Sequence, residues 1–324
     1  MARPRIALLS NPKSTGNLAQ LPRIRAFCAD HPDIFHYEVE KAEQVGDALK
    51  TIARVRPKVL VINGGDGTVQ AALTELHNGG HFGDAPPPVA VLPSGKTNLI
   101  ALDLGAHGDP IVALEKLLEL VQADLAPHIV GRELIALRCG TGEQRPVIGM
   151  FLGGAGLADT ILYCRNKIYP LGLPNGISHG ITALALLARL LLRLKMGFLP
   201  PALRPLKVSV RSESRLSGRF TLLAVTTLEK LLMSSDLSGR GTGALKLIAF
   251  DERPATLLRV MFAGLIGKLG KHNLRGVTYE HADEISIEGD RSNVILDGET
   301  FSAEIGRPIF LRPAQSLSFV RFAA

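Results

Sequence analysis

The chain has 324 residues, 46% hydrophobic and 21% charged, a balance that excludes disordered and fibrous proteins and leaves room for two domains. The formal net charge of +7 favours anionic partners, such as nucleotide phosphates or an acidic membrane surface. We expect no nucleic-acid partner, because aromatic residues make up only 5% and no basic run is interleaved with stacking side chains.

The three cysteines and the N-terminus bear on location. Cys28, Cys139 and Cys164 lack any C-x-x-C spacing, which predicts neither a disulfide framework nor a zinc site. The basic N-terminus is followed by an apolar run that stops at Ser10, too short for a signal-peptide core. We therefore expect a cytoplasmic protein.

The first part of the chain alternates short aliphatic runs with stretches that are apolar at helical spacing. This alternation predicts a parallel sheet covered by helices, a Rossmann-like three-layer α/β domain with right-handed crossovers. The expected strands are 5–9, 34–39, 58–62 and 88–92, and the expected helices are 18–29, 42–55 and 68–77.

Beyond about residue 127 the pattern changes to strand-like runs separated by glycine, serine and arginine turns. We expect strands at 133–139, 147–152, 206–210, 220–227 and 244–250, with more near the C-terminus. This pattern predicts a mostly antiparallel β domain.

The strongest motif is Gly64-Gly65-Asp66-Gly67-Thr68, which follows an apolar strand and opens a helix. Glycines free the backbone and let its N–H groups approach a ligand, and the helix N-terminus adds positive potential. The motif therefore predicts a phosphate cradle, in which Asp66 would act on a magnesium-bound nucleotide. The alternative is a tight turn with Asp66 as the N-cap of the helix.

Two further loops leave expected strands in the same way, 10–17 and 92–98. The second contains Gly95-Lys96-Thr97, but Ala90 stands where a P-loop requires glycine, so the Walker spacing fails. Loops at the carboxyl ends of parallel strands are where open α/β sheets bind ligands. Together the three loops predict one nucleotide site.

These motifs resemble the diacylglycerol kinase catalytic-domain family, which includes bacterial lipid kinases and the sphingosine and ceramide kinases. The matching residues are Asn11-Pro12, the run 64–68, and Pro93 with Gly95, Thr97 and Asn98. The resemblance implies an ATP-dependent lipid kinase, with ATP and Mg as cofactors and a lipid hydroxyl, diacylglycerol-like or sphingoid-like, as acceptor. It also implies a β-sandwich after the nucleotide domain, and peripheral contact with the membrane.

A short motif near the end of the chain, Asp297-Gly298-Glu299, also matches this family. The resemblance implies that it reaches back to the interdomain cleft, where Glu299 or Asp297 would be the base for the attacking hydroxyl. Asp-Gly between alternating apolar runs also predicts a β-hairpin turn. Both interpretations can hold at once.

The resemblance implies a nucleotide-binding domain over 1–127 and a lipid-substrate domain over 128–306, with 307–324 a candidate to return to the first domain. Asp66 is also the candidate metal residue, through nucleotide-bound Mg. The implied nucleotide-binding residues are Asn11, Pro12, Lys13, Ser14, Gly64, Gly65, Asp66, Gly67, Thr68, Gly95, Lys96, Thr97 and Asn98.

Two departures and two alternatives stay open. Lys96 adds a cation where many relatives are uncharged, and the stretch 234–246, which matches a structural-metal loop of bacterial relatives, has one acid, Asp236. A kinase of the NAD kinase type or for another small molecule shares the glycine motif, but the Asn-Glu motif expected of NAD kinases is not found. A catalytically silent nucleotide-binding protein is the other alternative. The sequence does not identify the lipid. It also leaves the oligomeric state open, with a homodimer as one alternative.

The most apolar stretch, 177–196, contains Arg189, Arg193 and Lys195. These charges near its end argue against a membrane span. We expect a helix that either lies on an anionic membrane through Arg189 and Arg193 or packs on the second domain with its arginines in water.

Overall fold

The structure is a computed structural model that describes residues 5–83, 85–95, 97–142, 144–171, 181–182, 185–186, 188–189, 199–210, 214–229, 242–265 and 274–322. Lys96 and most of the stretches 177–196 and 234–246 lie outside the described residues.

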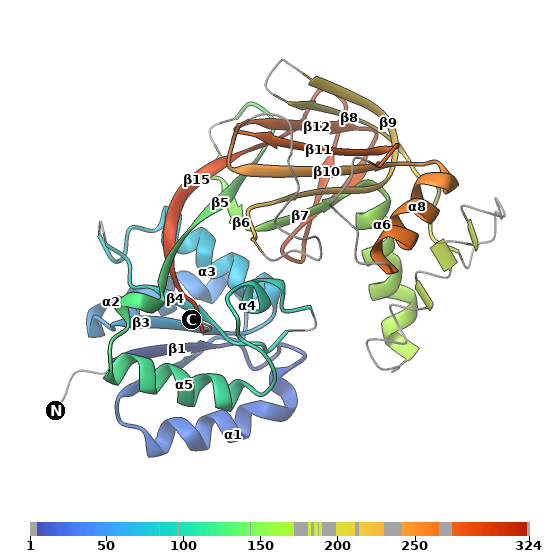
Figure 1. The fold of residues 1–324 in the computed structure, drawn as a ribbon. Coiled ribbons are helices and arrows are strands. Elements are labelled where there is room, and N and C mark those ends of the chain that lie inside the picture. The colour runs from blue at the N-terminus through green and yellow to red at the C-terminus, as the bar shows by residue number, and fades with distance from the viewer. Residues whose placement is uncertain are drawn as a thin grey trace.

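The first part of the chain forms a parallel sheet in the order β4-β3-β1-β2. Helices α1 and α5 lie against one face, and α2 and α3 against the other (Figure 1). Strands β1, β3 and β4 are buried along their length, which explains their largely apolar sequence. The elements are β1 (Ile6–Ser10), α1 (Asn17–Asp30), β2 (Ile34–Glu38), η1 (Ala42–Gln44), α2 (Val45–Val55), β3 (Val59–Asn63), α3 (Asp66–Asn78), β4 (Val89–Val91), α4 (Leu99–Asp103), α5 (Pro110–Gln122) and η2 (Ala126–His128).

The second part is mostly antiparallel. The predicted fold class, an α/β domain followed by a mostly antiparallel β domain, is confirmed. Its strands are β5 (Ile129–Cys139), β6 (Val147–Gly149), β7 (Phe151–Gly154), β8 (Pro205–Val210), β9 (Ser214–Thr226), β10 (Leu245–Asp251), β11 (Val277–Ala282), β12 (Ile285–Gly289), β13 (Ser292–Leu296), β14 (Glu299–Ala303) and β15 (Ile309–Val320). The helical segments are α6 (Ala155–Tyr163), the π-helical η3 (Cys164–Ile168), η4 (Tyr169–Leu171) and α8 (Pro254–Leu265).

One long strand, β9, folds this sheet around a core. It pairs with β8 up to Arg219, and from Phe220 onward it pairs with β7 and β10. Side chains from both parts of the sheet, including Leu137, Val225 and Ile285, are fully buried in one cluster between them. Burial of these apolar side chains is the main stabilising term of the domain.

The expected strand at 147–152 is two strands, β6 and β7, separated at Met150. The main chain of Met150 leaves the ladder because it has other partners: its N–H donates to Asp297 Oδ2 at 2.7 Å, and its carbonyl accepts from Thr226 Oγ1 at 2.9 Å. The interruption therefore belongs to the surroundings of Asp297.

The last strand, β15, joins the two parts of the molecule (Figure 1). It begins beside β12, pairs with β5 along its length, and ends beside β4, where Phe319 is opposite Val89. Phe319 is fully buried in the core of the first domain. A pair of strands, β5 and β15, thus runs from one domain into the other.

Within the described residues, no helix is both long enough and apolar enough to cross a membrane.

Candidate active site

Three loops meet at the carboxyl ends of β1, β3 and β4. Asn11 Nδ2 donates to Thr68 Oγ1 at 2.9 Å, which joins the first loop to the start of α3. Ser14 Oγ donates to the carbonyl of Ser94 at 3.0 Å, which joins the first loop to the third. The contacts bring the three loops into one site, as their positions after parallel strands predicted.

Close approach, rather than unusual backbone conformation, explains Gly67 and Gly95. None of Gly64, Gly65 and Gly67 has a left-handed φ. A Cβ on Gly95 would lie 3.2 Å from Gly65 Cα, and one on Gly67 would lie 3.1 Å from Glu299 Oε1. Larger residues would push the loops apart and displace Glu299.

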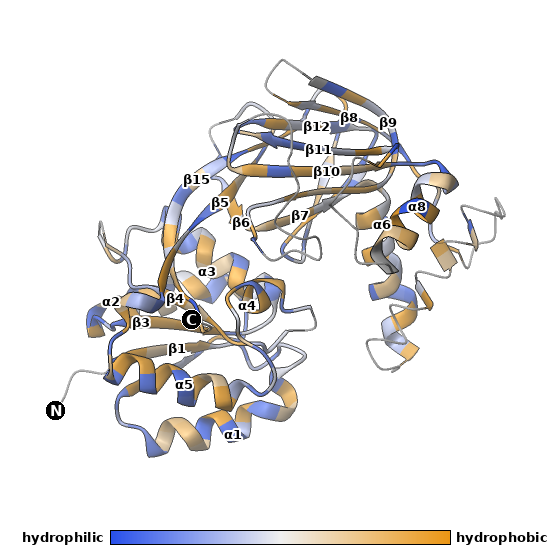
Figure 2. Cartoon of the chain, viewed as in Figure 1, coloured by the Kyte–Doolittle hydropathy of each residue, from blue (hydrophilic) through white to orange (hydrophobic). Residues whose placement is uncertain are grey.

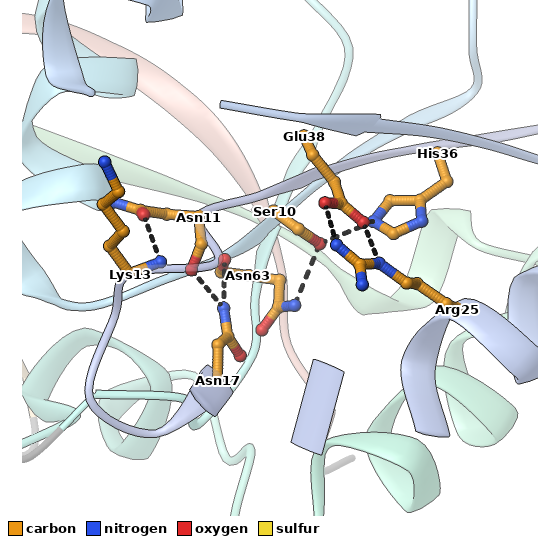
Figure 3. A network of polar contacts seen from close by, with 8 residues as sticks. All are labelled: Ser10, Asn11, Lys13, Asn17, Arg25, His36, Glu38 and Asn63. Carbon is orange, nitrogen blue, oxygen red and sulfur yellow. Dashed lines mark hydrogen bonds and ion pairs between the residues drawn. The ribbon is translucent and has the colours of Figure 1, made fainter. Parts of the chain in front are cut away.

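A network of polar contacts joins the first loop to the ends of β1 and β3 (Figure 3). Ser10 Oγ lies 2.9 Å from both Asn63 Nδ2 and His36 Nε2. Asn17 Nδ2 donates to the carbonyls of Asn11 and Asn63, at 2.9 and 3.0 Å. Burial lowers the pKa of His36, which favours its neutral form. The sequence assigned no role to these side chains, although Ser10 and Asn63 each end a strand, which is a usable signal.

The three loops and Glu299 enclose a polar cavity of about 260 Å³. It lies at the N-terminus of α3, where main-chain N–H groups and the helix dipole favour an anion. Its lining residues are Asn11, Lys13, Ser14, Thr15, Ala42, Gly65, Gly67, Thr68, Gly95 and Glu299.

Seven of the predicted nucleotide-binding residues line this cavity, and the others that the structure describes do not. Gly64 is buried, and a Cβ on it would overlap the side chain of Thr68. Asn98 is in the left-handed region, φ 54°, and its Oδ1 accepts from Gly95 N at 2.6 Å. Pro12 is absent from the lining, and Lys96 lies outside the described residues.

The segment Asp297-Gly298 forms the turn of the β13–β14 hairpin. Leu296 pairs directly with Glu299, and the two residues between them have φ of 41° and 93°. These values are those of a two-residue type I′ turn, so the hairpin interpretation is confirmed. A Cβ on Gly298 would lie 3.6 Å from Gly67 N, which places the turn against the start of α3.

Both carboxylate oxygens of Asp297 are held by main-chain N–H groups. Oδ2 accepts from Met150 N at 2.7 Å, and Oδ1 accepts from Phe151 N at 3.0 Å. Asp297 is only 6% exposed. Burial raises the pKa of Asp297 to about 7, a rise that the two N–H groups oppose and the nearby charge of Asp66 increases.

Asp66 is the first residue of α3, and the N-cap is Gly65, so the interpretation of Asp66 as the N-cap residue is wrong. Burial raises the pKa of Asp66 to about 6, and a hydrogen bond with the Thr97 side chain opposes the rise. Asp66 is therefore a half-buried carboxyl that changes charge near neutral pH.

A second cavity, of about 350 Å³, lies on the other side of the hairpin turn. Apolar surface makes up most of its wall, and Asp66, Asp297 and Gly298 are among its lining residues. Its other lining residues are Thr97, Leu99, Phe151, Leu157, Thr160, Ile161, Cys164, Tyr169, Thr182, Leu186 and Ile295. The two cavities are thus lined by neighbouring residues, Asp66 and Gly67 on α3 and Gly298 and Glu299 on the hairpin.

No group of three or more His, Cys, Asp or Glu side chains suited to a metal is found among the residues that the structure describes. Oxygen ligands from a nucleotide would complete the coordination of a hard cation beside Asp66 or Glu299.

Residues 5–126 match the sequence model of the diacylglycerol kinase catalytic domain. The resemblance to this family is confirmed for that part of the chain. No curated protein matches the chain in sequence.

Solved structures resemble the chain along nearly its whole length. A diacylglycerol kinase from Bacillus anthracis str. Sterne is 15% identical, with a TM-score of 0.62 over 98% of this chain and 97% of that one. Two other structures, each described as a diacylglycerol kinase of the same organism, are 16% identical, with a TM-score of 0.64 and the same coverage. At such identities the likeness shows the fold, both domains included.

Proposed function

We propose that the protein is an ATP-dependent lipid kinase, which transfers the γ-phosphate of ATP to a hydroxyl of a diacylglycerol-like or sphingoid-like lipid. One observation carries the proposal. A polar, glycine-lined cavity and an apolar cavity adjoin at Asp66-Gly67 and Gly298-Glu299. With ATP in the polar cavity and the acyl chain of a lipid in the apolar one, the γ-phosphate and the lipid hydroxyl would meet at the carboxylates of Asp66 and Glu299.

The polar cavity suits the phosphates of ATP. The N-terminus of α3 and the close-packed loops present main-chain N–H groups to a bound anion. Lys13, whose exposed ammonium lies 3.2 Å from Glu40 Oε2, is within the lining and adds a cation. Magnesium carried by the nucleotide would be held by Asp66 or Glu299 and would neutralise charge on the transferred phosphoryl group.

The apolar cavity suits a lipid better than a soluble acceptor. Leu157, Ile161 and Ile295 are among its lining residues, and such side chains offer a dinucleotide or sugar no hydrogen bonds. This lining favours a lipid kinase over a kinase of the NAD kinase type.

In the proposed reaction the lipid hydroxyl oxygen forms a bond to the γ-phosphorus, and the bond from that phosphorus to the bridging oxygen breaks. ADP leaves with the bridging oxygen, and the hydroxyl proton passes to a carboxylate. Positioning and fixed charge supply most of the rate acceleration in such reactions.

The surroundings of the three carboxylates favour Asp66 as the proton acceptor. It faces the apolar cavity, and its pKa of about 6 leaves it largely ionised at neutral pH. Asp297, a base candidate from the sequence, faces the same cavity but spends both oxygens on main-chain N–H groups. Glu299, the other candidate, lines the polar cavity, where we propose that it meets the magnesium.

The proposal is tested by labelled-phosphate transfer from ATP, with magnesium, to a panel of lipids in detergent micelles. The panel contains diacylglycerol, monoacylglycerol, a sphingoid base and a polyprenol. We expect transfer to one class well above the others. Transfer to a soluble acceptor alone, or to none, would contradict the proposal.

The matched control for this assay is Asp66→Asn, which keeps the size of the side chain and removes its charge. We expect turnover to fall by about a hundredfold to ten-thousandfold, the usual contribution of a positioned base, while ATP still binds. ATP binding is measured separately by calorimetry. Near wild-type turnover in this variant would remove Asp66 from the mechanism.

A further inference from the structure

Helix α8 (Pro254–Leu265) connects β10 to β11 at the end of the second domain that also holds α6 (Figure 1). Its sequence, PATLLRVMFAGL, contains one charged residue, Arg259. Figure 2 shows hydrophobic colour along much of the helix. A helix that is apolar all round is normally buried on all sides.

Only one side of α8 is buried. Thr256 and Ala263 are 1% and 6% exposed, and Val260 packs against the cluster of Ala224, Ile248 and Phe250. These three positions, 256, 260 and 263, recur at helical spacing, so they form the inward stripe. The packing of α8 on the domain is thus already satisfied by this side.

The outward side carries large apolar side chains. Leu258, Met261 and Phe262 are 50%, 43% and 65% exposed. Their spacing of three and four residues places them next to one another on a single face. Single exposed apolar residues are common on soluble proteins, but three on adjoining turns form a patch, which marks a contact surface.

Exposed arginines border this patch. Arg259 is exposed at the edge of the outward face, and its Nη1 donates to the carbonyl of Arg275 at 3.4 Å. Arg275 and Arg253 are themselves exposed at the two ends of the α8 connection. Arg253 has an acidic neighbour, Asp251, at 3.6 Å, so the positive charge of the border is only partly offset.

The inward side of α8 is connected to the wall of the apolar cavity through one packed cluster. Val260 of α8 belongs to the same packed cluster as Leu157 and Phe151, and both of these residues line the cavity.

We propose that the outward face of α8 docks on an anionic lipid bilayer, with Leu258, Met261 and Phe262 in the interface and the arginines at the headgroups. Apolar side chains flanked by cations are the features that hold a helix in the plane of such an interface. The choice of a bilayer as occupant rests on the proposed lipid substrate.

A second copy of the chain is the competing occupant. A two-fold contact centred on this patch would bring Arg253, Arg259 and Arg275 of each copy toward the same arginines of the other. Like charges would then meet in a partly desolvated contact, which disfavours the dimer. An anionic bilayer complements both the apolar patch and its border.

The absence of tryptophan from the chain makes a direct test possible. Phe262→Trp creates a single fluorophore in the patch, and Val112→Trp creates a matched one on α5, where Val112 is 60% exposed. Both proteins are mixed, without nucleotide, with vesicles of phosphatidylcholine and phosphatidylglycerol that carry brominated acyl chains. We expect quenching and a blue shift for Phe262→Trp and neither change for Val112→Trp.

Variants of the patch supply the second measurement. In the Phe262→Trp protein, Leu258→Gln with Met261→Gln should lower vesicle partitioning at least tenfold, because two apolar side chains no longer enter the interface. The matched pair Val112→Gln with Ile305→Gln, also exposed residues, should change it little. Raising the salt concentration should weaken binding by the wild type. Circular dichroism checks that each variant is folded.

Three results would overturn the proposal: no quenching of Phe262→Trp by anionic vesicles, equal partitioning by the Leu258→Gln, Met261→Gln variant, or a wild-type dimer that this double variant makes monomeric. Phosphate transfer to a short-chain lipid in micelles distinguishes a failure of the docking proposal from a failure of the proposed function. We expect the double variant to keep that activity, so a loss of vesicle binding alone concerns docking. Absence of transfer by the wild type concerns the function alone.

Discussion

The three acidic side chains around the hairpin turn differ in burial and in hydrogen bonding. Asp297 is held by two main-chain N–H groups, Asp66 meets the hydroxyl of Thr97, and Glu299 is exposed beside Gly67. A carboxylate that accepts two main-chain N–H bonds orients the chain, whereas one with a free oxygen can take up a proton or a metal. These differences separate structural from chemical roles among residues that the sequence alone could not rank.

The substitutions Glu299→Gln and Asp297→Asn should have different effects. Glu299→Gln should lower turnover and raise the magnesium concentration needed for half-maximal rate, with little change in thermal stability, because its side chain is exposed. Asp297→Asn should lower stability by about 1–3 kcal/mol, because an amide NH₂ would face a main-chain N–H donor. Magnesium titrations of kcat and urea unfolding check both results. A Glu299→Gln variant with normal magnesium dependence would contradict the role proposed for Glu299.

The pH dependence of turnover should report Asp66. A general base works when deprotonated, so kcat/KM should fall as pH decreases through about 6, the pKa of the Asp66 carboxyl. Thr97→Val removes the hydrogen bond that lowers this pKa, so the acid limb should move to higher pH.

The control is Thr97→Ser, which keeps the hydroxyl. The acid limb of its pH profile should stay near that of the wild type. The measurement is kcat/KM between pH 5 and 8, on a micellar lipid substrate, for the wild type and both Thr97 variants. An unshifted limb in Thr97→Val would mean that Asp66 is not the titrating group.

At the scale of the elements, the β13–β14 hairpin is fixed by the strands around it. Asp297 binds the segment at Met150 and Phe151, where β6 ends and β7 begins, and Gly298 meets the start of α3. The position of the carboxylates is therefore set from both domains. Changes in a neighbouring strand should reach the site without altering any carboxylate.

Gly149→Ala tests this coupling. A Cβ at Gly149 would lie 2.5 Å from Asp297 Oδ2 and 2.7 Å from the side chain of Leu296, so the turn must move. We expect a loss of about 1–3 kcal/mol, as for other overpacked sites, with lower kcat and nearly unchanged ATP binding. Gly131→Ala, in β5 with nothing within 4 Å of its Cβ, is the matched control and should be neutral. Equal effects of the two variants would contradict the coupling.

The elements show which parts of the fold the sequence could predict. The parallel strands and the three loops follow from local signals, namely aliphatic runs that end in glycine and small polar residues. The helix α5 was not predicted, although Asp109 caps it by accepting from Ile111 N at 2.8 Å and Pro110 is its first residue. That signal, Asp before Pro at a helix start, was available in the sequence.

Other features depend on contacts between distant residues and could not be read from the sequence. Asp297 and Met150 are 147 positions apart, and the burial of Asp297 follows from where the strands pack. The outward face of α8 was also unpredictable, because an apolar helix gives no sign of which side is exposed. Motifs identified the loops of the site, whereas packing decided which carboxylate faces which cavity.

At the scale of the whole molecule, the two domains share both a strand pair and a buried polar cluster. Arg132 of β5 donates from Nε to Asp103 Oδ2 at 3.3 Å and from Nη1 to Glu229 Oε1 at 2.6 Å. Asp103 Oδ1 accepts from Glu229 N at 2.8 Å. This cluster ties α4 of the first domain to the segment that follows β9 in the second. Because β15 also enters both domains, we expect the two to unfold together.

Arg132→Leu should destabilise the whole molecule, because it removes the guanidinium beside a carboxylate that is 0% exposed. Breaking a buried ion pair in this way costs about 3–5 kcal/mol. Adding Asp103→Asn should restore part of the loss, since the buried charge is gone while the amide oxygen can still accept from Glu229 N. Arg312→Leu, which breaks an exposed pair with Glu284, should cost less than about 1 kcal/mol. Urea unfolding followed by circular dichroism measures all four proteins. The role of the cluster would be refuted if Arg132→Leu cost no more than Arg312→Leu, and a separate early transition would show that the domains unfold independently.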